Sequence, residues 1–302
     1  MEFSAWTFLS GAAGGAGYFF FAAELDEVAQ DDAPNSTFFM FDEDEEEDEG
    51  FGKFDEIVGW PAISLATTKP PGEPRLVVAV SPHGECWELH PATGDEQCGV
   101  IAGRFHLRRL AVVDHQIFAC GMNRVVLKRD GFARWAAIGP GPDAADPAVV
   151  GFEDIGGFSE AEMYAVGWGG EIWWRDGGQW RRADSPTNAN LCALACAPDG
   201  SVYVAGHDGV MLRGRHDQWQ LIETTRRDDL RDVAVFDGQV FVVTDFAIFR
   251  LTEAGLAPEA DFVDTHDLPA TCLHLLEASD GLVSLGQKDV FIRSDGLWRR
   301  LV

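Results

Sequence analysis

Short apolar runs alternate with polar turns along most of the chain, and the alternation repeats about every 40 residues. Four segments share one pattern, an apolar run that ends on glycine; they are residues 118–121, 164–167, 203–206 and 283–286. The glycines lie 46, 39 and 80 residues apart, and the longest interval spans two copies if Thr244 replaces the missing glycine. Self-similarity of this length predicts a repeat architecture in which each copy is one structural unit.

Each copy contains further short apolar runs around the glycine segment. One run precedes it, a second run after it closes on a basic residue, and a tryptophan then follows a polar turn. The tryptophans are Trp135, Trp180, Trp219 and Trp298, with Leu256 in the corresponding place of the weakest copy. Four short runs per copy, bounded by Gly/Asp turns, predict four antiparallel strands, and a radial array of such sheets protects its own edges. A β-sandwich also has regularly spaced short strands, but it gives no reason for a tryptophan in each period.

The copies divide the chain into blades. Six diverged repeats cover residues 62–302, with approximate bounds 62–104, 105–150, 151–188, 189–226, 227–265 and 266–302. Residues 1–61 contain three more apolar runs, at 6–9, 18–23 and 38–41, which we expect to form an irregular additional blade with an acidic loop at 42–49. We therefore predict an all-β, single-domain β-propeller over residues 1–302 with seven four-stranded antiparallel blades. Six blades with an N-terminal appendage is the alternative.

The turn before each tryptophan carries an aspartate. Asp130, Asp176, Asp217 and Asp295 precede the four tryptophans, usually with glycine beside them. An Asp side chain caps a tight turn, Gly supplies positive φ, and the following Trp buries its ring against the neighbouring sheet. This turn resembles a degenerate aspartate box of the bacterial-neuraminidase repeats, within the WD-repeat/YVTN/BNR-like propeller superfamily. The resemblance covers about residues 62–302 and implies the fold alone, because such boxes lie away from catalytic centres.

The copy at residues 151–188 has an additional tryptophan cluster. Trp168, Trp173 and Trp174 lie among glycines, and neighbours in a strand point to opposite faces, so Trp173 and Trp174 cannot share one packing layer. Exposed tryptophans often anchor protein interfaces. Trp168 and Trp174 are therefore candidate partner-binding residues, with burial between blades as the alternative.

Charge adds a second strong feature. The formal net charge is −27, of which residues 1–60 contribute about −15 through sixteen acidic side chains and Lys53. Eight consecutive carboxylates form an acidic tract, comprising Asp42, Glu43, Asp44, Glu45, Glu46, Glu47, Asp48 and Glu49. Like charges repel, so we expect a solvated loop unless a cationic partner meets it. Nucleic acid is excluded as a partner, because phosphate binding rests on Lys and Arg.

The acidic tract has two interpretations. It increases solubility by repelling other copies of the chain, or it steers a basic protein partner toward its binding site. A nuclease active site that normally binds nucleic acid is one such basic surface. A dedicated calcium site is not predicted, because the spaced ligands of a calcium loop are missing.

The cysteines and the N-terminal segment bear on location. Six scattered cysteines without a CxxC pair are typical of reduced core residues, which favours the cytoplasm. Residues 3–23 are uncharged, but their glycine-rich middle is a poor helix former and their flanks are acidic, unlike a signal peptide or an anchor. We expect two strands joined by a glycine loop instead, no membrane association, and a monomer.

No pattern of catalytic or metal-binding residues emerges. The eight histidines form neither HExxH nor any other metal-ligand pairing, and we expect no metal, no cofactor and no catalytic residue. A sialidase site needs an arginine cluster with a tyrosine nucleophile, whereas Tyr164 and Tyr203 occupy the repeated core position. We therefore expect a non-catalytic, acidic, protein-binding propeller. By analogy with small bacterial propellers we expect an immunity protein that neutralises a basic toxin domain; a general assembly scaffold and a propeller hydrolase or lyase are the second and third alternatives.

Overall fold

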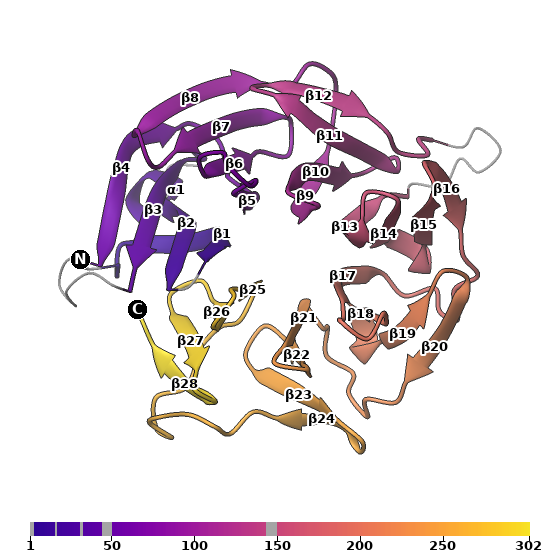
Figure 1. Cartoon of the computed structure of the whole chain (residues 1–302). Coiled ribbons are helices and arrows are strands. Elements are labelled where there is room, and N and C mark those ends of the chain that lie inside the picture. Colours follow the sequence, from indigo (N-terminus) through magenta and orange to yellow (C-terminus); the bar gives the residue numbers. More distant parts are fainter. Residues whose placement is uncertain (1–2, 16, 31–32, 44–49, 143–149) are drawn as a thin grey trace.

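Seven four-stranded antiparallel sheets form a closed ring in the computed structural model. The structure describes residues 3–15, 17–30, 33–43, 50–142 and 150–302. Figure 1 views the ring along its axis, with the first strand of each blade nearest the centre. The prediction of seven four-stranded blades is confirmed, and the alternative of six blades with an appendage is wrong, because the N-terminal segment makes a complete blade.

The first four blades follow one another in sequence order, each running from the centre outward. Blade 1 comprises β1 (Trp6–Gly15), β2 (Tyr18–Leu25), β3 (Ser36–Asp42) and β4 (Phe51–Val58). Blade 2 comprises β5 (Ser64–Thr68), β6 (Leu76–Val80), β7 (Glu85–His90) and β8 (Asp95–Val100). Blade 3 comprises β9 (Leu107–Val113), β10 (Gln116–Gly121), β11 (Val125–Gly131) and β12 (Arg134–Ala137). Blade 4 comprises β13 (Phe152–Ser159), β14 (Glu162–Gly167), β15 (Ile172–Asp176) and β16 (Gln179–Arg182).

The last three blades repeat the same order. Blade 5 comprises β17 (Leu191–Cys196), β18 (Val202–Gly206), β19 (Met211–Arg215) and β20 (Gln218–Ile222). Blade 6 comprises β21 (Asp232–Phe236), β22 (Gln239–Val243), β23 (Ile248–Thr252) and β24 (Gly255–Pro258). Blade 7 comprises β25 (His274–Glu277), β26 (Leu282–Leu285), β27 (Val290–Ser294) and β28 (Leu297–Arg300). The helical elements of the described residues are α1 (Asp26–Ala29) and two 3₁₀ turns, Trp168–Gly170 and His207–Gly209.

The repeated glycine has a packing reason. In blades 3, 4, 5 and 7 it ends the second strand, or directly follows it, against the backbone that leads into the first strand. A Cβ there would lie 1.9–2.5 Å from a carbonyl oxygen of that backbone at Gly121, Gly167, Gly206 and Gly286. Only glycine allows this approach without a shift of the chain. In blade 6 the buried Thr244 follows β22 at this place, as the repeat spacing predicts.

Blade 1 differs from the sequence prediction in two respects. The glycine-rich segment is not a loop, because β1 continues through it to Gly15. The first strands of the blades lie close together around the axis. A Cβ at Gly11 would lie 2.8 Å from Leu276 of blade 7, so this inner strand needs a glycine there. The fourth strand, β4, was not among the predicted runs, since Lys53, Asp55 and Glu56 interrupt its apolar pattern.

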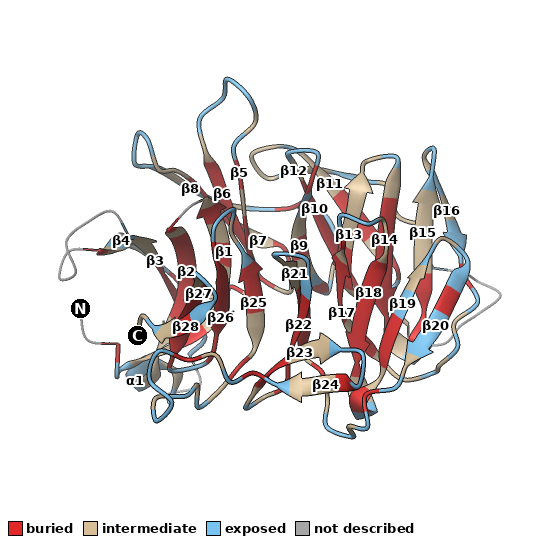
Figure 2. Cartoon of the chain, turned by 60° about the horizontal axis from the view of Figure 1, so that its bottom comes forward, coloured by how far each residue is buried: buried red, intermediate tan, exposed pale blue. Residues whose placement is uncertain are grey.

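The cores lie between blades. The described residues form seven clusters of buried hydrophobic side chains, and each cluster joins two consecutive blades. At the boundary of blades 1 and 2, for example, the rings of Phe38 and Trp87 stack with centroids 3.9 Å apart. Figure 2 shows the result, with buried residues along the strands and exposed residues in the turns and loops.

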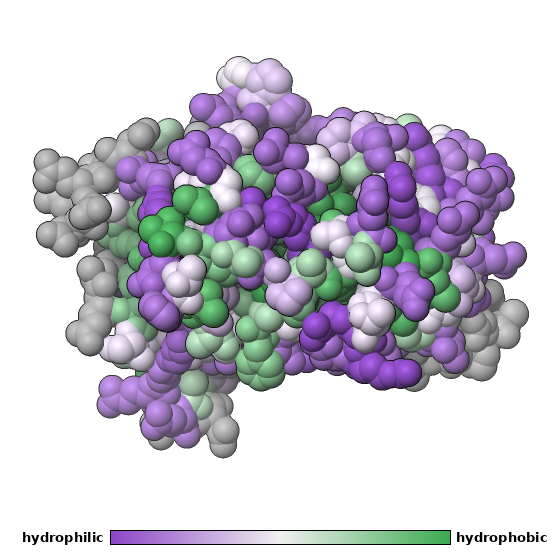
Figure 3. Space-filling view, turned by 90° about the horizontal axis from the view of Figure 1, so that it is seen from below, coloured by the Kyte–Doolittle hydropathy of each residue, from purple (hydrophilic) through white to green (hydrophobic). Residues whose placement is uncertain are grey.

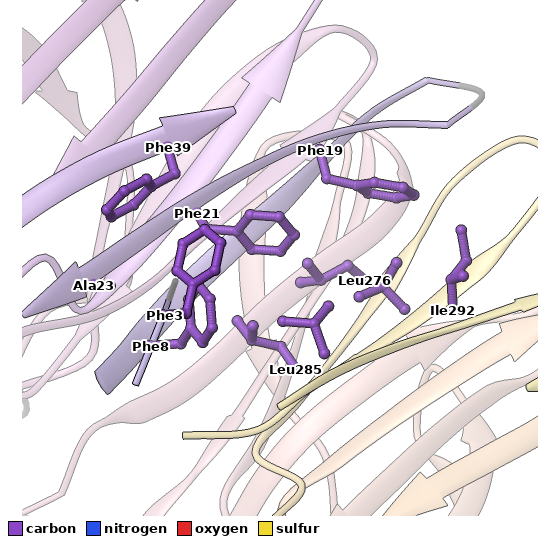
Figure 4. Close-up of a cluster of buried hydrophobic side chains, with 11 residues drawn as sticks. Phe3, Phe8, Phe19, Phe21, Ala23, Phe39, Leu276, Leu285 and Ile292 are labelled. Carbon is purple, nitrogen blue, oxygen red and sulfur yellow. The ribbon is translucent and has the colours of Figure 1, made fainter. Parts of the chain in front are cut away.

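The ring closes between blades 7 and 1 without a shared strand. Phe8, Phe19 and Phe21 of blade 1 pack on apolar side chains of blade 7 that include Leu285 and Ile292 (Figure 4). The backbone N–H of Phe8 donates a hydrogen bond of 2.9 Å to the carbonyl of Gln287. Phe3 and Val302, the first and last described residues, both belong to this cluster.

The repeated tryptophans occupy the fourth strands and contact the preceding blade, as predicted. Trp135, Trp180, Trp219 and Trp298, with Leu256 of blade 6, each join the cluster shared with that blade. They are not equally buried, however. Trp219 and Trp298 are buried, whereas Trp135 and Trp180 are half-buried.

Truncation of these tryptophans is expected to destabilise the propeller in proportion to burial. Trp298→Ala removes a ring with 0% exposure and should lower the free energy of unfolding by about 3–5 kcal/mol. Trp180→Ala should cost roughly half as much, because part of its ring already contacts water. Urea unfolding followed by circular dichroism measures both changes. Equal losses at the two positions would contradict the assigned difference in packing.

Candidate partner-binding surface

The two ends of the ring present different loops. In each blade the turns between the first and second strands and between the third and fourth strands lie at one end, which we call the hairpin face. The turns between the second and third strands and the connections between blades lie at the other end, which we call the loop face. This division follows from the antiparallel order of the strands.

The acidic tract begins on the hairpin face, as the turn between β3 and β4. Asp42 ends β3, and its N–H donates a 2.8 Å hydrogen bond to the carbonyl of Gly50, across the base of the turn. Glu43 forms an ion pair with Arg299 of blade 7. The remaining predicted residues lie outside the described residues; they are Asp44, Glu45, Glu46, Glu47, Asp48 and Glu49.

Other carboxylates accompany the tract on the hairpin face. The repeated turns place exposed acidic side chains there from blades 3, 5, 6 and 7 as well as blade 4. Six of them make no ion pair within the described chain, namely Asp130, Asp217, Asp237, Glu253, Asp280 and Asp295. The sequence analysis explained such aspartates as turn devices, and Asp237 and Asp295 do adopt positive φ. Their common face was missed, although the period of the repeat contains that information.

The two candidate tryptophans lie elsewhere. Trp168 follows β14 on the loop face, where it lines the central channel and its Nε1 donates a hydrogen bond to Glu153. Trp174 lies within β15, half-buried between blades 4 and 5, with its ring 4.7 Å from that of His216. Trp173 points to the opposite boundary, as predicted for adjacent residues of a strand. Trp168 therefore lies at the other end of the ring from Asp42 and Glu43, and Trp174 lies in another blade, beside the β19–β20 turn; the partner-binding role of both remains a prediction.

A charged crossbar spans the central channel. Arg109 of blade 3 reaches Asp154 of blade 4 at 3.2 Å and Asp232 of blade 6 at 2.8 Å. His274 of blade 7 lies 3.5 Å from the same Asp232 carboxylate. The two aspartates also accept backbone N–H groups of the next blades, from Leu194 at 2.8 Å and Leu275 at 3.1 Å. The crossbar thus joins blades on opposite sides of the channel.

The two aspartates of the crossbar respond differently to burial. Burial raises the pKa of Asp154 to about 6, and the neighbouring Arg109 offsets only part of this effect. Burial also acts on Asp232, but Arg109 and His274 outweigh it and lower the pKa of Asp232 to about 2. Asp232 therefore supplies the permanent negative charge of the crossbar.

The channel has a volume of about 780 Å³. Arg108, Glu153, Cys192 and His207 line it together with small and apolar residues of the first strands. Burial raises the pKa of the Cys192 thiol to about 12, so it stays protonated at neutral pH. Among the described residues, no group of three His, Cys, Asp or Glu side chains could hold a metal ion. In the same part of the chain, no helix is long and apolar enough to cross a membrane.

Comparison with known proteins identifies the family. The chain is 39% identical over 256 residues to immune protein Tsi7 of Pseudomonas aeruginosa, covering 83% of each protein. The chain belongs to the Tsi7 family. No protein-family model matches the sequence.

Two solved propellers resemble the Tsi7-family chain in fold. A structure of YCF48 bound to D1 peptide has a TM-score of 0.67 at 14% identity and covers 97% of this chain and 98% of its own. A structure of U3-55K has a TM-score of 0.67 at 10% identity and covers 96% of this chain and 95% of its own. At these identities the likeness concerns the propeller architecture alone. The predicted recognition of a propeller immunity family is confirmed by the two kinds of comparison together.

The raised pKa of Asp154 predicts that the stability of the fold depends on pH. Between its unfolded value near 3.8 and its folded value near 6, the folded state holds the proton more strongly, so stability falls as pH rises through this window. Asn cannot titrate, and it keeps one of the two oxygens that accept the N–H groups of Ile155 and Leu194, so the loss of the other acceptor costs the same at every pH. Asp154→Asn should therefore gain up to about 3 kcal/mol relative to the wild type between pH 4 and pH 7.

Urea unfolding at several pH values measures this difference. The matched control is Asp184→Asn, an exposed carboxylate without an ion pair within the described chain. A difference between Asp154→Asn and the wild type that stays constant with pH would contradict the assignment.

Proposed function

We propose that this chain is a non-catalytic immunity protein that binds and neutralises a basic toxin domain in the cytoplasm. The observation that carries the proposal is its family membership with immune protein Tsi7. The toxin itself is proposed to be a nuclease, whose substrate groove is basic because it binds phosphates. An acidic protein that covers such a groove competes directly with the nucleic acid.

The charge distribution supports a basic partner. The formal net charge of −27 raises the rate at which a cationic protein meets this chain. The hairpin face adds to this general field, because six of its turn carboxylates have no ion pair within the described residues. Such carboxylates can accept Lys or Arg of a partner without first breaking an internal salt bridge.

Protection in cells tests the proposed function. The gene of an immunity protein is expected to lie beside that of its toxin, so the toxin domain encoded next to this chain is the probe. Cells that produce the toxin domain alone should lose viability, and co-production of this chain should restore it. Toxicity that persists despite soluble chain, together with no binding of the purified proteins, would reject the proposal.

The acidic tract is expected to act on the association rate. Replacing Asp44–Glu49 by Ser and Gly, while keeping Asp42 and Glu43, preserves the described base of the turn and its contact with Arg299. The replacement should slow association by roughly tenfold at low salt, change dissociation little, and leave the melting temperature unchanged or slightly higher. Stopped-flow mixing at several salt concentrations measures the effect, which should shrink as salt screens the charges.

A second variant gives a comparison per charge, because it removes two carboxylates elsewhere where the tract replacement removes six. Asp184→Asn combined with Glu223→Gln neutralises exposed carboxylates of the loop face. Its association rate should stay within about twofold of the wild type. An association rate that changes neither with salt nor with the tract replacement would contradict steering. The negative charge would then serve solubility.

A further inference from the structure

The central channel has two unlike ends, because the crossbar of Arg109 and Asp232 separates them. The first strand of each blade runs from the loop face toward the hairpin face. Residues before the crossbar level therefore line the loop-face end, where Arg108, Glu153 and Arg231 place charges. Residues after that level line the hairpin-face end.

The hairpin-face end is lined by small and apolar side chains. Ala13 of blade 1, Thr67 of blade 2 and Val112 of blade 3 lie there. Glu277 of blade 7 adds a charged side chain to this lining. Val112 is 40% exposed, an unusual exposure for a valine in an innermost strand. We call this opening the hairpin-face mouth.

A groove between blades 6 and 7 continues the mouth. It has a volume of about 650 Å³ and shares Glu277 with the channel. Val235 and Phe236 form its apolar side, whereas Asp237, Asp280 and Asp295 provide carboxylates, and no basic side chain lines it. Figure 3 shows the outer side on which these last blades lie, where hydrophobic residues are scattered within a mostly hydrophilic surface.

The groove is held in shape independently of any partner. One carboxylate oxygen of Glu277 accepts the N–H of Val235 at 2.8 Å, which ties blade 7 to blade 6 at the point where mouth and groove meet. Glu277 has no basic partner within the described residues, and the same is true of Asp237, Asp280 and Asp295. An apolar floor with unpaired carboxylates at its rim is therefore preformed.

We propose, resting on the immunity function proposed above, that the toxin docks on the hairpin face by inserting a protruding apolar side chain into the mouth. Lys or Arg residues that flank this side chain then pair with the carboxylates of the groove. The arrangement matches the usual anatomy of an interface, in which an apolar anchor fills a central depression and charged groups surround it. The acidic tract begins on the same face, so a partner that the tract attracts arrives close to the mouth and the groove.

The loop face is the competing surface. It exposes Phe246 and Leu268, which could also contact a protein. Its end of the channel, however, presents Arg108 and Arg231, and its connection between blades 5 and 6 carries Arg226 and Arg227. Arg108, Arg226 and Arg231 already pair with Glu153, Asp228 and Asp245 of the same face. The carboxylates of the hairpin-face groove have no such partner within the described residues, which is why the proposal commits to the hairpin face.

Matched pairs of charge substitutions test the proposal. Val112→Arg and Asp280→Lys alter the mouth and the groove, whereas Leu268→Arg and Asp184→Lys make the same chemical changes at exposed positions of the loop face. All four positions are exposed, so melting temperatures should stay close to that of the wild type. The probe is the toxin domain encoded beside this chain, and surface plasmon resonance gives both rate constants.

Val112→Arg and Asp280→Lys should each raise the Kd at least tenfold, with Val112→Arg acting mainly through faster dissociation, while both controls stay within twofold. Weakening by the loop-face pair, with the hairpin-face pair unaffected, would overturn the docking surface and leave the immunity function intact. Tight binding by all four variants would also overturn it. Failure of the wild-type chain to bind the toxin domain would instead reject the proposed function.

Discussion

The propeller depends on the packing that closes its ring between blades 7 and 1. Blade 1 consists of N-terminal strands alone and blade 7 of C-terminal strands alone, so no strand crosses the boundary. Closure rests on aromatic side chains such as Phe19 and Phe21, both fully buried, against Val283 and Leu285. Burial of a large apolar side chain contributes roughly 1.5–3 kcal/mol, so several together can hold the two ends of the chain in one fold. Lys288 adds polar contacts there, to the carbonyl of Trp6 at 2.8 Å and to Asp26.

Closure also positions the first residues of the acidic tract. Glu43, at the start of the tract, forms an ion pair with Arg299 in the outermost strand of blade 7. The base of the tract therefore lies at the boundary between the first and last blades. Blades 1 and 7, although farthest apart in the sequence, therefore share the surface at which the tract begins.

Charged residues near the axis and charged residues in the turns are stabilised in different ways. At the axis, Arg109 compensates buried Asp154 and Asp232, because an unpaired charge in the interior is strongly destabilising. In the turns, aspartates bend the chain and stay hydrated, so the repeat can accumulate negative charge at little cost in stability. The same residues that make short turns thus give the hairpin face its carboxylates. For a member of the Tsi7 family, fold and surface charge arise from one repeated element.

The local repeat could be predicted from the sequence because its causes are local. Strand alternation, the turn aspartates and the glycine at the end of the second strand each depend on neighbouring residues, and together they gave seven blades and the place of the tryptophans. The outer strand β4 escaped prediction, because a strand with a neighbour on one side only tolerates Lys53, Asp55 and Glu56 in its pattern. The continuation of β1 through its glycines was not predicted for another reason. The glycines are needed because the strand packs closely against Leu276, which lies at the far end of the sequence.

Tertiary structure alone decided which charged and apolar residues meet. Arg109 and Asp232 are 123 residues apart and form an ion pair across the channel. No spacing or motif in the sequence predicts this contact. Trp168 lies at the loop-face end of the ring and the acidic tract begins at the hairpin-face end, because successive turns of an antiparallel blade lie at alternate ends. The sequence by itself determined the blades and the net charge, since both sum local contributions. The crossbar, the mouth and the closing contact required the ring, because each joins residues that only closure brings together.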